Sequence, residues 1–224
     1  MNKKCVKTKE LFECNIPYLK EFVENTTYPW EMLPQIKAHI TKLTEVGLPG
    51  FEEISEGVFV GKDVKIHPSA VIIPPAIIGN GTEIRPEAYL RGNIITGENC
   101  VIGNSSELKN CILMNKVQVP HYNYVGDAIL GNYSHMGAGS ICSNLKSDKS
   151  LVVVHGDENY ETGIKKFSAI LGDYADIGCG CVLNPGTVIG MHTNVYPLTS
   201  VRGVIPENSI VKSMTNIVIK EIRN

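Results

Sequence analysis

The sequence predicts a mainly β protein: a parallel β-helix made of six-residue repeats, with a short helical extension in front of it. Two observations predict this fold. An aliphatic residue recurs at every sixth position over most of the chain, and clear helical spacing occurs near its beginning. The chain has 224 residues, which is long enough to bury a substantial core.

The six-residue repeat starts at Val60, and in its first block only Thr96 breaks the aliphatic series. A period of six matches neither an α-helix nor the alternation of a single strand. A unit that turns one aliphatic side chain inward and then bends forms one side of a coil, and stacked coils pair their backbones. The predicted inward positions are Val60, Ile66, Ile72, Ile78, Ile84, Leu90, Thr96, Ile102 and Leu108, then Leu130, Met136 and Cys142, then Leu171, Ile177, Leu183, Ile189, Val195 and Val201.

Residues 29–46 form the predicted main helix of the extension. Pro29 suits the first helical position, apolar residues recur at intervals of three and four, and Gly47 followed by Pro49 ends the run. A shorter helix is expected within residues 10–25. We expect the apolar stripe to pack against the rest of the protein, because amphipathic helices normally bury that face.

These patterns divide the chain into three parts. Residues 1–56 are the helical extension, residues 57–205 the β-helix, and residues 206–224 a tail whose alternation predicts an edge strand or an extended arm. A polar insert at residues 143–168 interrupts the repeat, and the register is irregular ahead of Leu130. Loops on a rigid scaffold often carry function, so we expect function near the insert.

The composition argues against several classes of function. Charged residues make up 20% of the chain and the net charge is −2, which gives no basis for binding nucleic acid or an anionic membrane. We find no secretory signal and no apolar run long enough to span a bilayer. We therefore expect a cytoplasmic protein whose seven cysteines are reduced. The pair Cys179 and Cys181 is a weak metal signal, and we expect no metal.

Arg91 and Lys109 each follow an inward position and are three repeat units apart. If three units close one coil, both side chains leave the same side of neighbouring coils, about 4.8 Å apart. Stacked cations repel each other unless an anion lies between them, and an arginine with a lysine suits such an anion. The alternative is that both are ordinary solvated cations.

His121 lies in the irregular stretch, two units beyond Lys109, and therefore on another side of the coil. Histidine titrates near neutral pH and can carry a proton during catalysis. It would meet Arg91 and Lys109 best across a boundary with a second subunit. The alternative is a structural histidine at a turn, and Tyr124, judged by spacing alone, is a packed aromatic residue.

The residues around these positions carry a family resemblance. The segments EAYLRGN, SSELKN, PHYNYVGDA and GNYSHMGAGSICSN contain, in order, Arg91, Lys109, His121 with Tyr124, and Asn144. In order and spacing this set resembles the acetyltransferase domain of bifunctional N-acetylglucosamine-1-phosphate uridyltransferases. The resemblance covers about residues 58–205.

The resemblance implies a left-handed β-helix that forms a homotrimer with sites between subunits. It also implies transfer of acetyl from acetyl-CoA to glucosamine 1-phosphate, in UDP-N-acetylglucosamine biosynthesis. His121 matches the general base of the family. The residues that match the sugar-phosphate pocket are Arg91, Lys109, Tyr124, His135, Asn144 and Lys166, and those that match backbone contacts to coenzyme A are Cys179 and Pro197.

The chain departs from the family in three places. His135 stands in place of an asparagine and Leu145 in place of a tyrosine, which leaves the identity of the sugar open. The long insert is similar to that of archaeal members, whose range of sugar phosphates is broader. No glycine-rich nucleotide loop precedes the repeat, so we expect no pyrophosphorylase activity from this chain.

The mechanism that the resemblance implies needs a base and an oxyanion donor. A neutral His121 would accept the proton of the attacking amine, and a backbone N–H near Gly137 or Gly139 would stabilise the negative oxygen. Cys142 is an inward position, so we expect it in the core and not as an acyl carrier.

Two other functions stay open. A metal-dependent carbonic anhydrase uses the same scaffold, although the six histidines here lack its close HxxxxH pair. A non-catalytic trimer that binds a sugar nucleotide or regulates another protein is the second alternative, because pocket residues are altered.

Overall fold

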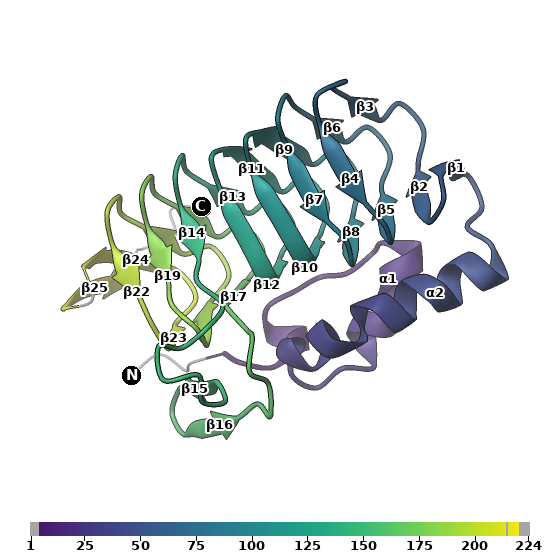
Figure 1. Ribbon diagram of the computed structural model, residues 1–224. Coiled ribbons are helices and arrows are strands. Elements are labelled where there is room, and N and C mark those ends of the chain that lie inside the picture. Colours follow the sequence, from purple (N-terminus) through teal and green to yellow (C-terminus); the bar gives the residue numbers. More distant parts are fainter. Residues whose placement is uncertain (1–4, 214, 220–224) are drawn as a thin grey trace, which may run out of the picture.

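The computed structural model describes residues 5–213 and 215–219. Its main body is the left-handed parallel β-helix that the resemblance implied, with the helices of the extension along one side (Figure 1). The helical segments are the 3-10 helix η1 (Thr8–Glu10), α1 (Pro17–Glu24), the 3-10 helix η2 (Pro29–Gln35) and α2 (Ile36–Val46).

Each full coil passes over three faces, which we call the first, second and third face. The first face contains β4 (Val71–Ile73), β7 (Tyr89–Arg91), β14 (Ile141–Cys142), β19 (Val182–Leu183) and β22 (Ser200–Val201). The second contains β2 (Val58–Val60), β5 (Ala76–Ile78), β8 (Ile94–Thr96), β17 (Ala169–Leu171), β20 (Thr187–Ile189) and β23 (Val204–Ile205). The third contains β3 (Lys65–Ile66), β6 (Glu83–Ile84), β9 (Val101–Asn104), β11 (Gln118–His121), β13 (His135–Met136), β18 (Asp176–Ile177), β21 (Asn194–Val195) and β24 (Ser209–Ser213).

Two longer strands turn a corner of the coil. They run from the first face onto the second and are β10 (Glu107–Leu113) and β12 (Tyr124–Leu130). The remaining strands pair antiparallel. They are β1 (Glu52–Ser55) with β2, β25 (Asn216–Ile219) with β24, and the hairpin of β15 (Val153–His155) and β16 (Asn159–Glu161).

The parallel pairing confirms the predicted inward ladder. Leu90 lies beside Leu108 of the next coil, and the inward side chains form one apolar core along the axis. In the irregular stretch Leu108 pairs with Val125, and Leu113 pairs with Leu130. Successive inward positions are therefore five residues apart where β10 and β12 turn the corner, and a count of six loses the register there.

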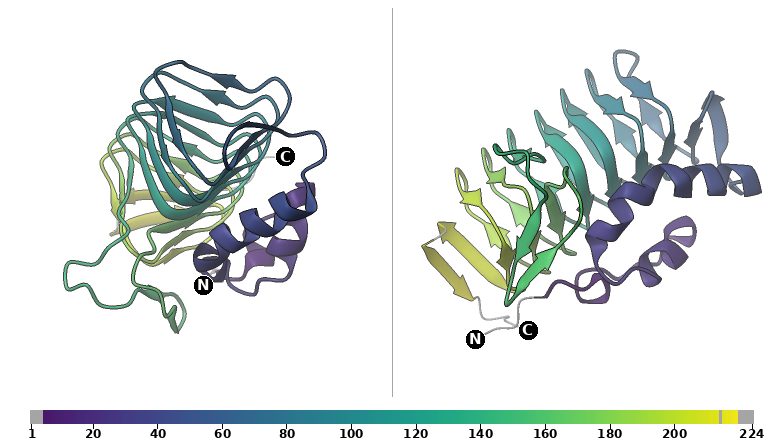
Figure 2. Two further views of the ribbon diagram at one scale, coloured as in Figure 1. Left: turned by 45° about the vertical axis from the view of Figure 1, so that its right-hand side comes forward. Right: turned by 60° about the horizontal axis from the view of Figure 1, so that its bottom comes forward.

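The second face differs from the other two because its outward side chains are also apolar and buried. Ile77, Ile95 and Ile112 occupy outward positions on β5, β8 and β10, and each is fully buried. The helices lie along this face of the coil (Figure 2). Trp30 and Leu33 of the extension belong to the same hydrophobic cluster as these isoleucines. Since burial of one isoleucine side chain is worth about 1.5–3 kcal/mol, this cover adds substantially to the stability of the fold.

The helix predicted over residues 29–46 is present as two consecutive segments, η2 and α2. Pro29 is its first residue, and Gly47, at φ +98°, ends it. Pro34 lies inside the first segment and removes a backbone donor, which is consistent with the break between the two. The shorter helix, α1, begins at Pro17 inside the expected range, because proline fits the first turn of a helix.

The insert at residues 143–168 extends this cover. Val154 lies in strand β15 of its hairpin, and Val152 directly precedes that strand. Both are fully buried in the cluster on the second face. The ring of Tyr160 lies 6.1 Å from that of Trp30 in the extension. The insert thus packs beside the helices and forms part of the same layer.

The predicted tail continues the third face. Its strand β24 pairs parallel with β21 and antiparallel with β25. Residue 214 and residues 220–224 of this tail lie outside the described residues. In the part of the chain that the structure describes, no helix is both long and apolar enough to span a membrane.

Candidate active site

The cations Arg91 and Lys109 lie in neighbouring coils on the first face, as predicted. The register of β7 and β10 sets them side by side along the axis. Each has its own acidic partner: Arg91 Nη1 lies 2.5 Å from Glu107 Oε1, and Lys109 Nζ lies 3.6 Å from Asp127 Oδ2. The hydrogen bond and the charge of Glu107 raise the pKa of Arg91. The repulsion between the two cations is therefore offset within the chain.

Tyr124 and Asn144 join the same group through Asp127. Asn144 Nδ2 donates to Asp127 Oδ2 at 2.6 Å and to the Tyr124 hydroxyl at 3.3 Å. Burial first, and then the charges of Asp127 and Glu107, raise the pKa of Tyr124. We call this group the Asp127 cluster, and its members are Arg91, Glu107, Lys109, Tyr124, Asp127 and Asn144.

Sequence reasoning missed the two acidic members of the cluster. Glu107 lies two residues before Lys109 on one strand, so both side chains leave the same face of the sheet. That spacing was a usable signal. Asp127 stands inside the quoted segment PHYNYVGDA, but spacing does not indicate that its carboxylate turns back toward the preceding coil.

Gly126 makes room for the Tyr124 ring. A Cβ at position 126 would come within 2.4 Å of the Tyr124 hydroxyl oxygen. Gly126 pairs in register with Lys109, so the ring leans from its own column toward that of the lysine. The glycine is needed here for space and not for an unusual backbone angle.

Lys166 lies at the end of the insert, next to the cluster. Its backbone forms a bridge with Leu145, and the N–H of Phe167 donates to the Asn144 carbonyl at 3.1 Å. The Lys166 side chain is exposed. The two ends of the insert therefore meet beside Asn144, and a third cation is within the same region.

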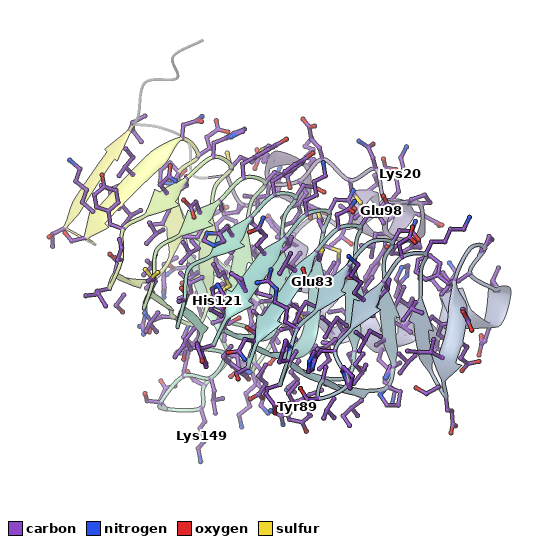
Figure 3. The ribbon with its side chains drawn as sticks, turned by 90° about the horizontal axis from the view of Figure 1, so that it is seen from above. Lys20, Glu83, Tyr89, Glu98, His121 and Lys149 are labelled. Carbon is purple, nitrogen blue, oxygen red and sulfur yellow. The ribbon has the colours of Figure 1, made fainter. Side chains whose placement is uncertain are left out.

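His121 lies at the corner between the third and first faces and is exposed. Seen from above, it lies over the middle of the coil, with Tyr89 toward one side and Glu98 toward the other (Figure 3). Residues 124–126 of β12 separate His121 from Asp127 across the first face, a span of about 10 Å. Within one chain, His121 and Asp127 therefore lie at opposite edges of the first face, and Tyr124 and Glu107 of the cluster lie toward the His121 edge.

Cys179 and Pro197 follow His121 along the same corner. Backbone hydrogen bonds join this corner from coil to coil: the N–H of Gly139 donates to the His121 carbonyl at 3.0 Å, that of Gly180 to Ala138 at 2.9 Å, and that of Leu198, which follows Pro197, to Cys179 at 2.9 Å. Cys179 and Pro197 also line a cavity of about 490 Å³ on the third face. The sites matched to coenzyme A thus share a ladder with the proposed base.

His135 lies on the third face and lines this same cavity. Its Nδ1 is 2.8 Å from Asp176 Oδ1, and Asn194 Nδ2 donates to the other carboxylate oxygen at 3.2 Å. Within one chain, His135 and Cys179 therefore line the same cavity, and Arg91 does not. Its role toward a sugar remains a prediction.

The N–H groups of Gly137 and Gly139, near which an oxyanion donor is predicted, both take part in backbone hydrogen bonds. The N–H of Gly137 already donates to Ile177 at 2.6 Å, and that of Gly139 to the His121 carbonyl at 3.0 Å. The ladder between coils uses both groups. Ala138 lies between them, is exposed, and has an N–H without an acceptor among residues 5–213 and 215–219.

Cys142 lies in the core as expected, whereas burial does not extend to every cysteine, because Cys179 is exposed and Cys14 only partly buried. Cys100 and Cys142 are fully buried, and desolvation raises the pKa of each to about 12. Cys142 therefore lacks the thiolate that an acyl carrier needs. In the described part of the chain, no three His, Cys, Asp or Glu side chains gather in a metal-ligand arrangement.

Comparison with curated proteins relates the chain to bifunctional enzymes. The bifunctional protein GlmU of Methanococcus aeolicus is 35% identical over 213 residues, which cover 87% of this chain and 48% of that protein. A bifunctional sugar-1-phosphate nucleotidylyltransferase/acetyltransferase of Sulfurisphaera tokodaii is 33% identical over 151 residues, or 62% of this chain and 38% of that protein. The chain is similar to these proteins over most of its own length. It spans about half the length of the GlmU proteins it matches, over their C-terminal acetyltransferase half.

A family model and solved structures extend this comparison. The model of the GMPPB C-terminal domain matches residues 72–163. The acetyltransferase domain of PglB from Neisseria gonorrhoeae, in complex with acetyl coenzyme A, has a TM-score of 0.43 and 19% identity, covering 70% of this chain and 57% of that one. At this level of similarity the solved structures bear on neither substrate nor mechanism.

Proposed function

We propose that this protein is an acetyl-CoA-dependent N-acetyltransferase. Its substrate is an amino-sugar phosphate such as glucosamine 1-phosphate, and the reaction serves UDP-N-acetylglucosamine biosynthesis. The observation that carries the proposal is the Asp127 cluster, because it joins four residues matched to the sugar-phosphate pocket: Arg91, Lys109, Tyr124 and Asn144.

The reaction needs a base for the amine. As the amine lone pair forms a bond to the acetyl carbon, the carbon–sulfur bond breaks and coenzyme A leaves as a thiolate, which then takes up the proton from the imidazolium of His121. Neutral His121 accepts the proton that the amine loses, and its exposed position at the corner admits both reactants. A positioned histidine of this kind accelerates such a step by about 10²–10⁴-fold.

The negative charge that grows on the thioester oxygen needs a fixed N–H donor. The N–H of Ala138 suits this role, since it follows His121 along the corner and has no acceptor in the described residues. Cys179 continues that corner and lines the adjoining cavity, which supports binding of the coenzyme A arm there.

The phosphate is held mainly by hydrogen bonds. The Asp127 cluster contains two cations and two carboxylates, so these four charges cancel, and the exposed Lys166 beside it adds one positive charge. The planar guanidinium of Arg91 provides paired donors for phosphate oxygens, while lysine acts as a point charge. Holding the phosphate fixes the position of the amine relative to the thioester.

The active form in this proposal is a homotrimer with each site shared by two subunits. Two observations support it. His121 and Asp127 of one chain lie about 10 Å apart across the first face, so a substrate held between two chains can meet His121 of one and Asp127's partners of the other. That face also exposes apolar side chains: Val71 is 49% exposed, Tyr89 42% and Ile141 41%.

A cytoplasmic location completes the proposal. Acetyl-CoA and nucleotide-sugar precursors are cytoplasmic metabolites, and the buried thiols of Cys100, Cys111 and Cys142 suit a reducing compartment.

The test is to follow free coenzyme A while the purified chain acts on acetyl-CoA and several amino-sugar 1-phosphates. We expect release that depends on both substrates. Without release for any sugar, the proposal fails. Thermal stabilisation by a sugar nucleotide but not by acetyl-CoA would instead favour the regulatory trimer. Stoichiometric zinc in the purified protein would favour the carbonic anhydrase alternative.

A further inference from the structure

Asp127 lies at the corner between the first and second faces, where its carboxylate is buried. The residue is 5% exposed and adopts φ +50°, a left-handed conformation that aspartate tolerates better than most residues. A buried carboxylate is costly unless charged or polar groups satisfy it. The contacts of Asp127 therefore indicate its role.

Both carboxylate oxygens have partners. Oδ2 accepts from Asn144 Nδ2 at 2.6 Å and lies 3.6 Å from Lys109 Nζ. Oδ1 accepts from Asn110 Nδ2 at 2.9 Å. Two of these three partners, Lys109 and Asn144, match the sugar-phosphate pocket. Asp127 thus holds two pocket residues in place while its own carboxylate stays buried.

The other side of Asp127 is anchored to the layer over the second face. Asn110 Nδ2 also donates to the Leu33 carbonyl in η2, at 3.2 Å. The Asp127 carbonyl accepts from the N–H of Ser168, at the end of the insert, at 3.0 Å. The helices therefore reach Asp127 through Asn110, and the end of the insert reaches it through Ser168, next to the contact of Phe167 with Asn144.

We propose that Asp127 is the positioning residue of the site: its carboxylate holds Lys109 and Asn144 in place for the amino-sugar phosphate, and the helical layer holds the carboxylate. The inference rests on the proposed function. The Lys109 side chain is 28% exposed, and a free lysine would sample many rotamers. Asn144 donates its amide N–H groups to Asp127 and Tyr124, which orients its amide oxygen as an acceptor for a sugar hydroxyl.

The main variant is Asp127→Asn, which keeps the shape but removes the charge and places an amide N–H₂ among donors. We expect the KM for the amino-sugar phosphate to rise about 10–100-fold, because the hydrogen bonds to a charged carboxylate that hold Lys109 and Asn144 are lost. The KM for acetyl-CoA stays within about twofold, because Cys179 and Pro197 lie on the other edge of the first face.

Asp173→Asn is a matched control. Asp173 is 2% exposed and accepts from the Asn132 N–H at 2.7 Å and from the Glu13 N–H at 2.9 Å. It too ties the β-helix to the N-terminal extension, but it touches no predicted site residue. We expect Asp173→Asn to lower the melting temperature and to leave both KM values unchanged.

The outcomes separate the two proposals. If the wild type releases no coenzyme A, the proposed function fails. If the wild type is active and Asp127→Asn keeps its KM for the sugar phosphate, or if both variants change that KM equally, the positioning role fails alone. Should Asp127→Asn not fold, Asn110→Gly removes the link to Leu33 and one partner of the carboxylate, and glycine tolerates the φ of +47° at this position. A smaller rise in the same KM then supports the role, and an unchanged KM overturns it.

Discussion

The first and second faces are made by the same coils but differ in what their outward side chains do. Strand β10 belongs to both, and it turns Glu107 and Lys109 outward on the first face and Ile112 outward on the second. On the second face these outward positions are apolar and lie beneath helices and the insert. On the first they carry charges and aromatic rings. The repeat thus determines the fold, and the residues at outward positions determine what packs against or binds to each face.

The largest difference should come from His121→Ala at the edge of the first face. We expect kcat/KM to fall about 10²–10⁴-fold, because the proton acceptor is lost. Stability should change by no more than about 0.5 kcal/mol, as for most exposed side chains. Coenzyme A release and urea denaturation measure the two effects. His155→Ala, an exposed histidine of the insert hairpin, is the control with unchanged rates.

A pair of isoleucine substitutions compares the faces directly. Ile112→Ala opens a cavity under the helical cover and should cost about 2–5 kcal/mol at any protein concentration. Ile141 is 41% exposed in one chain, so loss of stability in Ile141→Ala should appear only through subunit contacts. Urea denaturation over a range of protein concentrations checks this. A concentration-independent loss for Ile141→Ala would contradict an interface on the first face.

Mixed trimers test whether one site uses both edges of the first face. His121→Ala and Lys109→Ala subunits should each be nearly inactive alone. Refolded together in equal amounts, they should regain intact sites at about a quarter of positions, as random assembly of a symmetric trimer requires. Coenzyme A release measures the recovery. No recovery above the separate variants would mean that each site is built within one chain.

Gly126→Ala should disturb the Asp127 cluster without touching a charge. The new Cβ would meet the Tyr124 ring, with its hydroxyl oxygen 2.4 Å away, so the ring must move. We expect the KM for the sugar phosphate to rise about tenfold, which corresponds to about 1.4 kcal/mol. In a Tyr124→Ala background the same substitution should add nothing further, since the two residues are in contact. Additive effects would show that position 126 acts by another route.

The smallest effect concerns His39 in the helical cover. It stacks on Phe22 with ring centroids 4.2 Å apart, and its Nε2 lies 2.8 Å from the Tyr18 carbonyl. Burial lowers the pKa of His39 from its usual 6.5. The unfolded chain therefore binds the proton more readily, so this contribution is complete above about pH 6.5 and is lost as the pH falls through the lowered value.

Urea denaturation at about pH 7.5 and about pH 5.5 measures this loss. His39→Gln keeps an N–H donor but does not titrate, so the free energy of unfolding should depend less on pH in this variant. An equal pH dependence in both proteins would rule out His39 as its source.

Several features followed directly from residue spacing. The inward ladder, the helix over residues 29–46 and the neighbouring positions of Arg91 and Lys109 all depend on a regular period and three sides per coil. Apolar residues that recur at such a period leave little choice of fold, because any other arrangement would expose them. The same pattern placed Cys142 in the core.

Other features depended on the folded chain. The partners of Arg91 and Lys109, the five-residue step at a corner and the separation of His135 from the Asp127 cluster all result from how side chains reach between coils. Such contacts join residues far apart in sequence, and their choice depends on distances of a few ångströms. A repeat therefore specifies the ladder, whereas only the packed coils decide which carboxylate neutralises which cation.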